Sequence, residues 1–439
     1  MLLLIPAVFA ADPVPELKFE KYTLGNGLEV ILSEDHRVPL VSVDIWYHVG
    51  ADKEVKGRSG FAHLFEHIMF QGSKNVPEDQ FFAILEGAGA PLINGTTDFD
   101  RTNYFETVPA NQLDLALWLE SDRMGFLLDT LTQERLDNQK AVVRKERQQS
   151  TENVPYGVAE EQFYKTLFPA PHPYNGVVIG SHEDLEAATL ADVKGFFETW
   201  YVPNNATLVI VGDFDPAAAK AKVEKYFGSL KGGAEPVAQQ VVTEPIAAEK
   251  RLALTDEVEL PKVYLGWITS PAFRPGDAEL TLGASVLAEG KSSRLHRALV
   301  HDQQIAQSVN AYQYPLTLGS VFVVEILGKP DQKPEDIEKA AWTVIEGLRA
   351  APPTDDEIAR ARRSWQASTL RGLEQLGGFG GKADVLNYYN HHTGDAGFLD
   401  DDFARFSAVT PAAVQKAFSE QVRADNRVVV HVSPVGGAK

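Results

Sequence analysis

The sequence predicts an α+β protein made of two homologous domains, each with an antiparallel-rich sheet packed against several helices. Three observations support this fold class. The chain has 439 residues, too many for one ordinary hydrophobic core. Strand-like segments lie near both ends of each half, and helical periodicity is grouped between them. Finally, the stretch at residues 189–213 recurs at residues 410–434, which indicates an internal duplication.

The recurring stretch also suggests where the domains begin and end. TLADVKGFFETWYVPNNATLVIVGD at 189–213 aligns without a gap on TPAAVQKAFSEQVRADNRVVVHVSP at 410–434. Both copies predict a Thr-capped amphipathic helix, a short turn and a β-branched strand. Residues 228–240, GSLKGGAEPVAQQ, lack an apolar period, as is typical of a linker. We therefore expect domains at 11–230 and 241–439, joined by a linker at 231–240.

Both halves contain strands and helices in a similar order. In the first half, apolar and β-branched residues predict strands at 28–34, 41–50, 102–108 and 206–212. In the second half, the same signals predict strands at 262–268, 320–327 and 427–432. Helical periodicity is clearest at 335–348 and 355–376.

Composition excludes several classes of function. The formal charge is -20, and a surface this acidic argues against nucleic acid as a partner. The chain contains no cysteine, so disulfides, thiolate zinc sites and cysteine nucleophiles are all excluded. Any metal must therefore be bound by His, Asp or Glu.

The first ten residues, MLLLIPAVFA, predict the remnant of a secretory signal peptide that ends at Ala10. The run is too short to span a bilayer, and it lacks the basic segment that begins such signals. A frayed apolar tail is the alternative. We expect an exported, periplasmic protein without membrane insertion.

Residues 61–70, FAHLFEHIMF, predict a short amphipathic helix with two different faces. A spacing of 100° per residue places its apolar residues on one side and His63, Glu66 and His67 on the other. Ser59 is the expected N-cap, and Gly72 is the expected stop after the helix.

The polar face of this helix has the pattern of a metal site. Side chains four residues apart lie one turn apart, so His63 and His67 are able to reach one cation, and Glu66 leans over the same place. A zinc ion with an open position lowers the pKa of its bound water, and a nearby carboxylate accepts the proton. The alternative is a solvated polar face. Chance is a poor explanation for the full His-x-x-Glu-His pattern in a chain with 11 His, and the helix is too apolar for a surface element.

HLFEH at 63–67 matches the inverted zinc motif, and its setting resembles the pitrilysin and insulinase family of zinc metallopeptidases, especially the mitochondrial processing peptidase type. The resemblance covers nearly the whole chain. It rests on NGLEVILSEDHRVPLVSVDIWYHVGADKE before the motif, on GAPLINGTTDFDRTNYFETVP and NQKAVVRKERQQSTENVPYG after it, and on GKSSRL in the second half.

This resemblance implies His63 and His67 as zinc ligands and Glu66 as the general base. The third ligand in the family is a glutamate within the segment that matches AVVRKERQ, which selects Glu146. Spacing alone leaves Glu134 and Glu152 open. Some relatives carry a second acidic residue two turns before the third ligand, where this chain has Gln139, so a supporting carboxylate at that point is in doubt.

The family's substrates add as a strand to a sheet edge beside the zinc, and the segment that matches this edge is PLINGTTD. The resemblance therefore implies Asn94 and Gly95 as substrate-binding residues. The same letters are also typical of a plain Asn-Gly turn. The family's fold further implies that the two domains together form half of a clamshell chamber.

The second half lacks the motif, because LTLGASVLAEGKSSRL contains no His, and we therefore expect one Zn²⁺ per chain. Fully active relatives place a substrate-binding Arg and an oxyanion-stabilising Tyr after the SRL segment. Alignment puts Val300 and Gln307 at these positions. The resemblance then implies a heterodimer with a zinc-less homologue that supplies both groups. A misplaced alignment is the alternative.

The leading hypothesis is thus a zinc metalloendopeptidase subunit that hydrolyses peptides or unfolded segments in a closed cavity. Two hypotheses of other classes stay open: a non-catalytic assembly or scaffold subunit, and a peptide-binding protein of the same family. Bound zinc argues against a scaffold, and peptide affinity without cleavage would indicate the binding protein.

Overall fold

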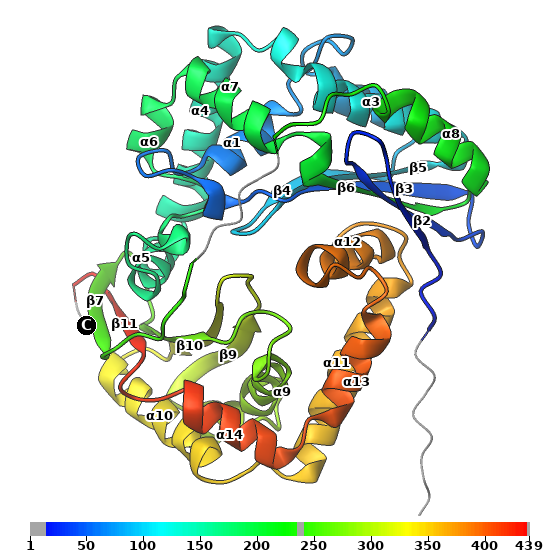
Figure 1. Cartoon of the computed structure of the whole chain (residues 1–439). Helices are drawn as coiled ribbons and strands as arrows, with labels where there is room; N and C mark the ends of the chain where they lie inside the picture. Colours follow the sequence, from blue (N-terminus) through cyan, green and yellow to red (C-terminus); the bar gives the residue numbers. More distant parts are fainter. Residues whose placement is uncertain (1–14, 235–240, 437–439) are drawn as a thin grey trace, which may run out of the picture.

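The computed structural model describes residues 15–234 and 241–436, which form two sheets with their helices (Figure 1). The strand order is β1-β2-β6-β3-β5-β4 in the first sheet and β7-β11-β8-β10-β9 in the second. The strands are β1 (Glu20–Thr23), β2 (Glu29–Glu34), β3 (Leu40–Tyr47), β4 (Leu92–Thr97), β5 (Thr102–Pro109), β6 (Ala206–Gly212), β7 (Lys250–Asp256), β8 (Lys262–Thr269), β9 (Ala306–Tyr314), β10 (Ser320–Gly328) and β11 (Val428–Pro434).

The helices lie between the strands along the chain. They are α1 (Phe61–Ile68), α2 (Gln80–Gly87), α3 (Leu113–Phe126), α4 (Gln133–Arg147), α5 (Gly157–Leu167), α6 (His182–Ala187), α7 (Leu190–Trp200), α8 (Pro216–Phe227), α9 (Asp277–Ala288), α10 (Pro334–Ala350), α11 (Asp355–Leu373), α12 (Lys382–Thr393), α13 (Leu399–Ala408) and α14 (Pro411–Gln421). None of the helices in the described ranges is both long and apolar enough to cross a membrane.

The two sheets share one topology, which confirms the predicted fold class and the duplication. Without β1, the two strand orders correspond one to one. Each sheet has a single parallel pair, β2 with β6 and β7 with β11, and its other pairs are antiparallel. The predicted domain boundaries stay a prediction. Residues 1–10, and residues 235–240 of the expected linker, lie outside the described residues.

The repeated helix and strand match in detail. Thr189 and Thr410 cap α7 and α14, and each hydroxyl accepts a hydrogen bond from the backbone N–H three residues later. The Asn205 side chain donates to the carbonyl of the last residue of α7 at 2.8 Å, and Asn426 donates to the last residue of α14 at 3.1 Å. The same turn chemistry therefore leads into β6 and β11.

The expected strands were all found, and the strands that the sequence pattern did not predict are β1, β4, β7 and β9. These four strands are the ends of the two sheets. Edge strands are partly solvated and so lack a continuous apolar pattern; β9, for example, is mostly half-buried or exposed. Only the family resemblance pointed to the β4 segment as a sheet edge.

The two halves exchange helices. α5, from the first half, packs on β8 and β11, whereas α12, from the second half, packs on β3 and β6. In Figure 1, α12 lies beneath the first sheet and α11 leads up to it. Phe163 of α5 approaches the second sheet so closely that a Cβ on Gly266 of β8 would collide with its ring. The opposite faces of the two sheets carry the helices of their own half.

Candidate metal centre

α1 has the two faces that its sequence predicts. Its apolar side chains are at most 3% exposed and belong to the core of the first half: Phe61, Leu64, Phe65, Ile68 and the following Met69. His63, Glu66 and His67 lie on the other side, where His63 and Glu66 line a cavity. The apolar face therefore fixes the helix, and the polar face is turned toward open space.

The predicted N-cap was wrong. Gly60, with φ at +85°, precedes α1 without a side-chain cap, and the Ser59 hydroxyl donates instead to Asp184 at 2.6 Å. The Glu54 carboxylate accepts the N–H groups of Gly60 and Ala62, each at 2.9 Å. A half-buried glutamate from outside the helix thus satisfies backbone N–H groups at the start of α1. The expected stop, Gly72, has a left-handed φ of +96°.

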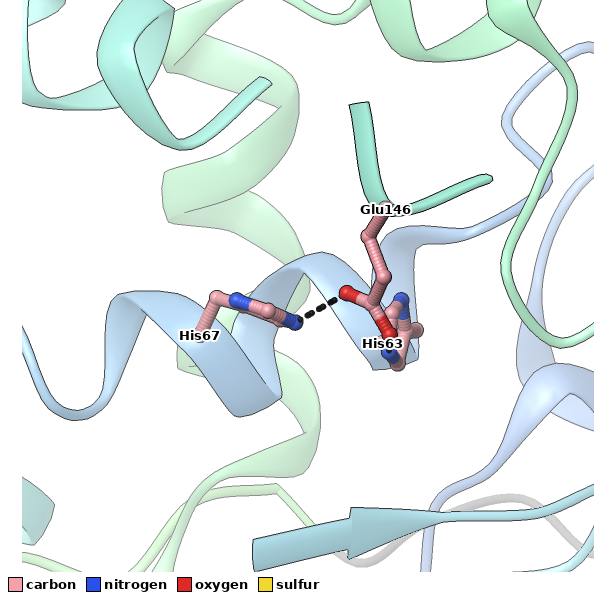
Figure 2. Close-up of side chains that lie close together, drawn as sticks. All are labelled: His63, His67 and Glu146. Atoms are coloured by element: carbon pink, nitrogen blue, oxygen red, sulfur yellow. Dashed lines mark ion pairs between the residues drawn. The ribbon is translucent and has the colours of Figure 1, made fainter. Parts of the chain in front are cut away.

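Three potential ligands converge between α1 and α4 (Figure 2). Nε2 of His67 lies 3.0 Å from one carboxylate oxygen of Glu146, and Nε2 of His63 lies 3.7 Å from the other. One donor atom from each of the three residues lies within 4.8 Å of the others. Over residues 15–234 and 241–436, this is the only such group of three or more His, Cys, Asp or Glu.

The tertiary contact of α1 with α4 brings Glu146, and neither of the two other candidates that spacing left open, next to the two histidines. Glu134 lies in the first turn of α4, whereas Glu146 is next to its last residue. Glu152 binds elsewhere, 2.9 Å from His182 and 3.1 Å from Arg147. Gln139 is buried and lines a smaller cavity together with Glu66 and His67, so an uncharged amide occupies the place of the acidic residue of some relatives.

The protonation states suit a cation. Burial lowers the pKa of His63 to about 4, so its imidazole is neutral at pH 7. The hydrogen bond with His67 lowers the pKa of Glu146, which keeps that carboxylate charged. Burial raises the pKa of Glu66. Two imidazoles and one carboxylate form a donor set that Zn²⁺ prefers, so the residues present fit a three-ligand zinc site.

Glu66 is held by β4, the edge strand of the first sheet. The Thr97 hydroxyl donates to one Glu66 carboxylate oxygen at 2.7 Å. A Cβ on Gly95 would meet Phe70 and Tyr104 at 3.1 Å and Glu66 at 3.2 Å, so only glycine lets α1 and β4 approach without displacement. Thr97 therefore contacts only one of the two carboxylate oxygens of Glu66.

Asn94 and Gly95 lie on the free edge of β4, next to Glu66. The Gly95 N–H donates to the Asn94 side chain at 2.9 Å and not to β5, so it points out of the sheet. The segment is therefore a strand and not the plain turn that its Asn-Gly letters also allow. Its backbone is in a position to pair with an added strand, and the role of both residues in substrate binding stays a prediction.

Both halves line the cavity beside the metal centre, which has a volume of about 680 Å³. His63, Glu66 and Thr97 come from the first half, and Tyr312 and Tyr314 come from β9. No sequence signal points to these tyrosines, because they lie on an edge strand that the apolar pattern does not reveal.

The positions of the missing Arg and Tyr lie outside this group of lining residues. Val300 is half-buried in a π-helical turn, His296–Asp302, and Gln307 is exposed on β9. Neither Val300 nor Gln307 is among the described residues that line the cavity. The Tyr312 hydroxyl is itself engaged, because it donates to Glu325 at 2.9 Å.

Comparison with known proteins agrees with this fold. The family described as "Insulinase (Peptidase family M16)" matches residues 29–173, and "Peptidase M16 inactive domain" matches residues 187–364. A Helicobacter pylori protein named zinc protease PqqE is 32% identical over 362 residues, which cover 81% of this chain and 80% of that protein.

Two solved structures extend the comparison. A Helicobacter pylori protease superposes with a TM-score of 0.88 at 28% identity, covering 96% of this chain and 100% of its own. The periplasmic protease PqqL of Escherichia coli shares the fold, with a TM-score of 0.78 at 15% identity, but 95% of this chain covers only 48% of PqqL. Family matches on both halves and a close zinc-protease relative lead to one conclusion: this chain belongs to the insulinase family of peptidases, family M16.

Proposed function

We propose that this chain is the zinc-bearing subunit of a metalloendopeptidase that hydrolyses peptides or unfolded segments in a closed cavity. The observation that carries the proposal is the convergence of His63, His67 and Glu146 beside Glu66, at the mouth of a cavity lined by both halves. A scaffold has no need of two imidazoles and a carboxylate around one point.

His63, His67 and Glu146 would hold one Zn²⁺. When bound, such an ion polarises a substrate carbonyl and makes water a stronger acid. Glu66 is placed to accept the proton of the attacking water and to return it to the leaving amine. Thr97 fixes one carboxylate oxygen of Glu66 and so orients the other toward the cavity. The free edge of β4 would hold the peptide extended across this point.

The second half suggests that a partner completes the site. Val300 and Gln307 stand where relatives with full activity have Arg and Tyr, so this chain lacks the proposed oxyanion donor. Loss of one such donor costs about a hundredfold or more in rate. The PqqL fold is about twice as long as this chain, which supports an assembly of two such units. We infer a heterodimer with a zinc-less homologue.

Glu66→Gln tests the assigned base. The variant removes the basic group and keeps the shape, so we expect zinc content equal to wild type and peptide hydrolysis reduced by about a thousandfold. Zinc is measured by elemental analysis and turnover with a fluorogenic peptide mixture. Turnover close to wild type in a zinc-loaded Glu66→Gln enzyme would show that Glu66 is not the base.

The heterodimer is tested by assay of the purified chain alone and with a homologue that carries the Arg and Tyr. We expect weak hydrolysis alone and strong hydrolysis with the partner. Full activity of the isolated chain would contradict the proposed assembly. Zinc and peptide binding without hydrolysis under either condition would instead identify a peptide-binding protein, and a chain that binds no zinc would be a scaffold.

The proposed location is the periplasm, as the apolar start of the sequence suggests and as the name of PqqL indicates for that protein. Cell fractionation with a C-terminal tag tests this, and recovery of the processed chain with the cytosolic fraction would contradict it.

A further inference from the structure

An exposed phenylalanine lies on a glycine-rich loop beside the candidate active site. Residues 376–381, LGGFGG, connect α11 to α12, and Phe379 at their centre is 65% exposed, more than any other phenylalanine that the structure describes. Full burial of a Phe side chain is worth roughly 1.5–3 kcal/mol, so a ligand that covers Phe379 would gain part of this free energy.

The loop holds Phe379 in one place. Leu376 anchors its start in the apolar cluster beneath the first sheet. Gly378 and Gly380 have φ of +83° and +68°, a region that favours glycine. The N–H of Gly381 donates to the carbonyl of Gly378 at 2.9 Å, and the N–H of Gly380 donates to Asp384 of α12 at 2.8 Å. These bonds close the loop on itself and tie it to α12.

The loop crosses the first sheet toward the free edge of β4. A Cβ on Gly377 would collide with Ser42 of β3, whereas a Cβ on Gly378 would lie 3.0 Å from Leu92 of β4. Phe379 follows, and its ring contacts Phe105 of β5 edge-on at 5.4 Å. The loop therefore lies against β3, β5 and β4, and at Gly378 it reaches the edge strand on which Asn94 and Gly95 lie.

The register of β4 and β5 shows which residues of β4 share a face of the sheet with Phe379. Leu92 is paired with Thr107, and Asn94 is paired with Phe105. Paired residues point to the same face, so Leu92 and Asn94 share the face of Phe379 and α12. Gly95 and Thr97 point to the opposite face, toward Glu66. A peptide paired with β4 would likewise present alternate side chains to the two faces.

We propose that Phe379 and Leu92, with the buried Phe105 ring packed behind Phe379, form an apolar subsite for a large apolar side chain of a peptide bound along β4. The side chain belongs to the peptide residue opposite Leu92, three positions from the residue opposite Gly95. This subsite rests on the proposed peptidase function and adds a sequence preference to it. It selects for Leu, Phe or similar side chains three or four residues from the cleaved bond.

Peptide profiling tests the subsite. The wild-type enzyme, with its partner if one is required, is incubated with peptides from denatured, trypsin-digested casein, and every cleavage site is read by mass spectrometry. We expect large apolar residues to be enriched at one position three or four residues from the cleaved bond. Phe379→Ala should lose this enrichment alone, and Phe379→Leu should retain part of it.

Two synthetic peptides that differ only by Leu or Ser at this position give the magnitude of the preference. We expect Phe379→Ala to lower kcat/KM about tenfold for the Leu peptide and to leave the Ser peptide unchanged. Val435→Ala removes an equally exposed apolar side chain, 62% exposed, from the far end of the chain and is the matched control. An unchanged profile in Phe379→Ala, with wild-type cleavage intact, overturns the subsite and leaves the peptidase function standing.

If no cleavage occurs, equilibrium binding tests the subsite separately from the peptidase function. The same Leu and Ser peptides are titrated into the Glu66→Gln enzyme, with and without the Phe379→Ala change. A Leu preference of about tenfold that disappears with Phe379→Ala supports the subsite even if hydrolysis fails. Equal binding of both peptides to both proteins overturns it. Because Phe379 is exposed, its removal should leave the melting temperature unchanged.

Discussion

The two halves of the molecule have one topology, but the residues that the structure describes hold a single candidate metal centre, in the first half. α1 follows β3 and turns His63, Glu66 and His67 toward a cavity, whereas α9 follows β8 and carries no His. α9 packs against β9, α11 and α14, and a Cβ on its Gly283 would collide with the ring of Phe418. The same fold is therefore stable with or without the site, which belongs to one helix face and not to the fold.

Removal of one of the three proposed zinc ligands should have the largest effect on this difference between the halves. Glu146→Ala removes one of three donors, and we expect zinc affinity to fall by at least about a hundredfold, with loss of peptide hydrolysis. Elemental analysis after dialysis and the thermal shift on zinc addition measure it. Glu134→Ala and Glu152→Ala are the matched controls, because neither residue lies in the cluster. Equal zinc loss in a control variant would contradict the assignment of Glu146.

One ion pair from each half allows the stability of the two interiors to be compared. Arg123 and Glu120 of α3 are 1% and 0% exposed, and the Arg123 guanidinium lies 4.2 Å from the centre of the Tyr104 ring. Arg123→Met leaves a buried unpaired carboxylate and should cost about 3–5 kcal/mol in the free energy of unfolding. Arg294→Met breaks a pair with Glu357 that is 25% and 18% exposed in the second half, and it should cost about 1 kcal/mol.

Urea titration measures both effects. A double change that replaces Arg123 and Glu120 by apolar residues should recover part of the loss, because Glu120 is no longer left unpaired, whereas the buried Glu106 still loses the nearby guanidinium. Equal costs for the two single variants would show that burial does not distinguish the pairs.

The stability of the second half should depend on acid pH through a histidine–glutamate pair that has no counterpart at the matching position of the first half. The position of Ile210 in β6 is taken by His431 in β11, where Glu338 also binds Arg251 and Arg427. Burial alone would raise the pKa of Glu338, but the hydrogen bonds from His431 and Arg251 outweigh it and lower the pKa to about 2.

A lowered pKa in the folded state means stability that is present above pH 4.5 and lost as the pH falls toward 2. We expect Glu338→Gln to cost about 2 kcal/mol at pH 7 and to reduce the slope of stability against pH between 4.5 and 2. Denaturation at several pH values tests this. An unchanged slope would show that Glu338 does not set the acid sensitivity.

Gly95→Ala should have the smallest effect, and one confined to activity. The new methyl group would press on Glu66, Phe70 and Tyr104, and a shift of a few tenths of an ångström at Glu66 should lower kcat about tenfold with zinc content unchanged. Gly195→Ala in α7, where a Cβ has open space, is the control and should leave kcat unchanged. Similar kcat in both variants would show that Gly95 does not position Glu66.

The sequence by itself determined the local features. Apolar spacing within α1 predicted its buried face and the exposure of His63, Glu66 and His67 to a cavity, because both are properties of one helix. Central strands were predicted because they are buried on two faces and so are apolar throughout. The duplication was visible because its helix, turn and strand are contiguous in the chain.

Only the tertiary structure decided what depends on distant segments. The choice of Glu146 over Glu134 and Glu152 required the contact of α4 with α1, and the helix cap required Glu54 to fold back on Gly60. The exchange of α5 and α12 and the edge strands β1, β7 and β9 were likewise not predicted, and only the family resemblance pointed to β4 as an edge. A carboxylate or an edge strand has the same local pattern wherever the chain carries it, and its role follows from the partners that packing brings to it.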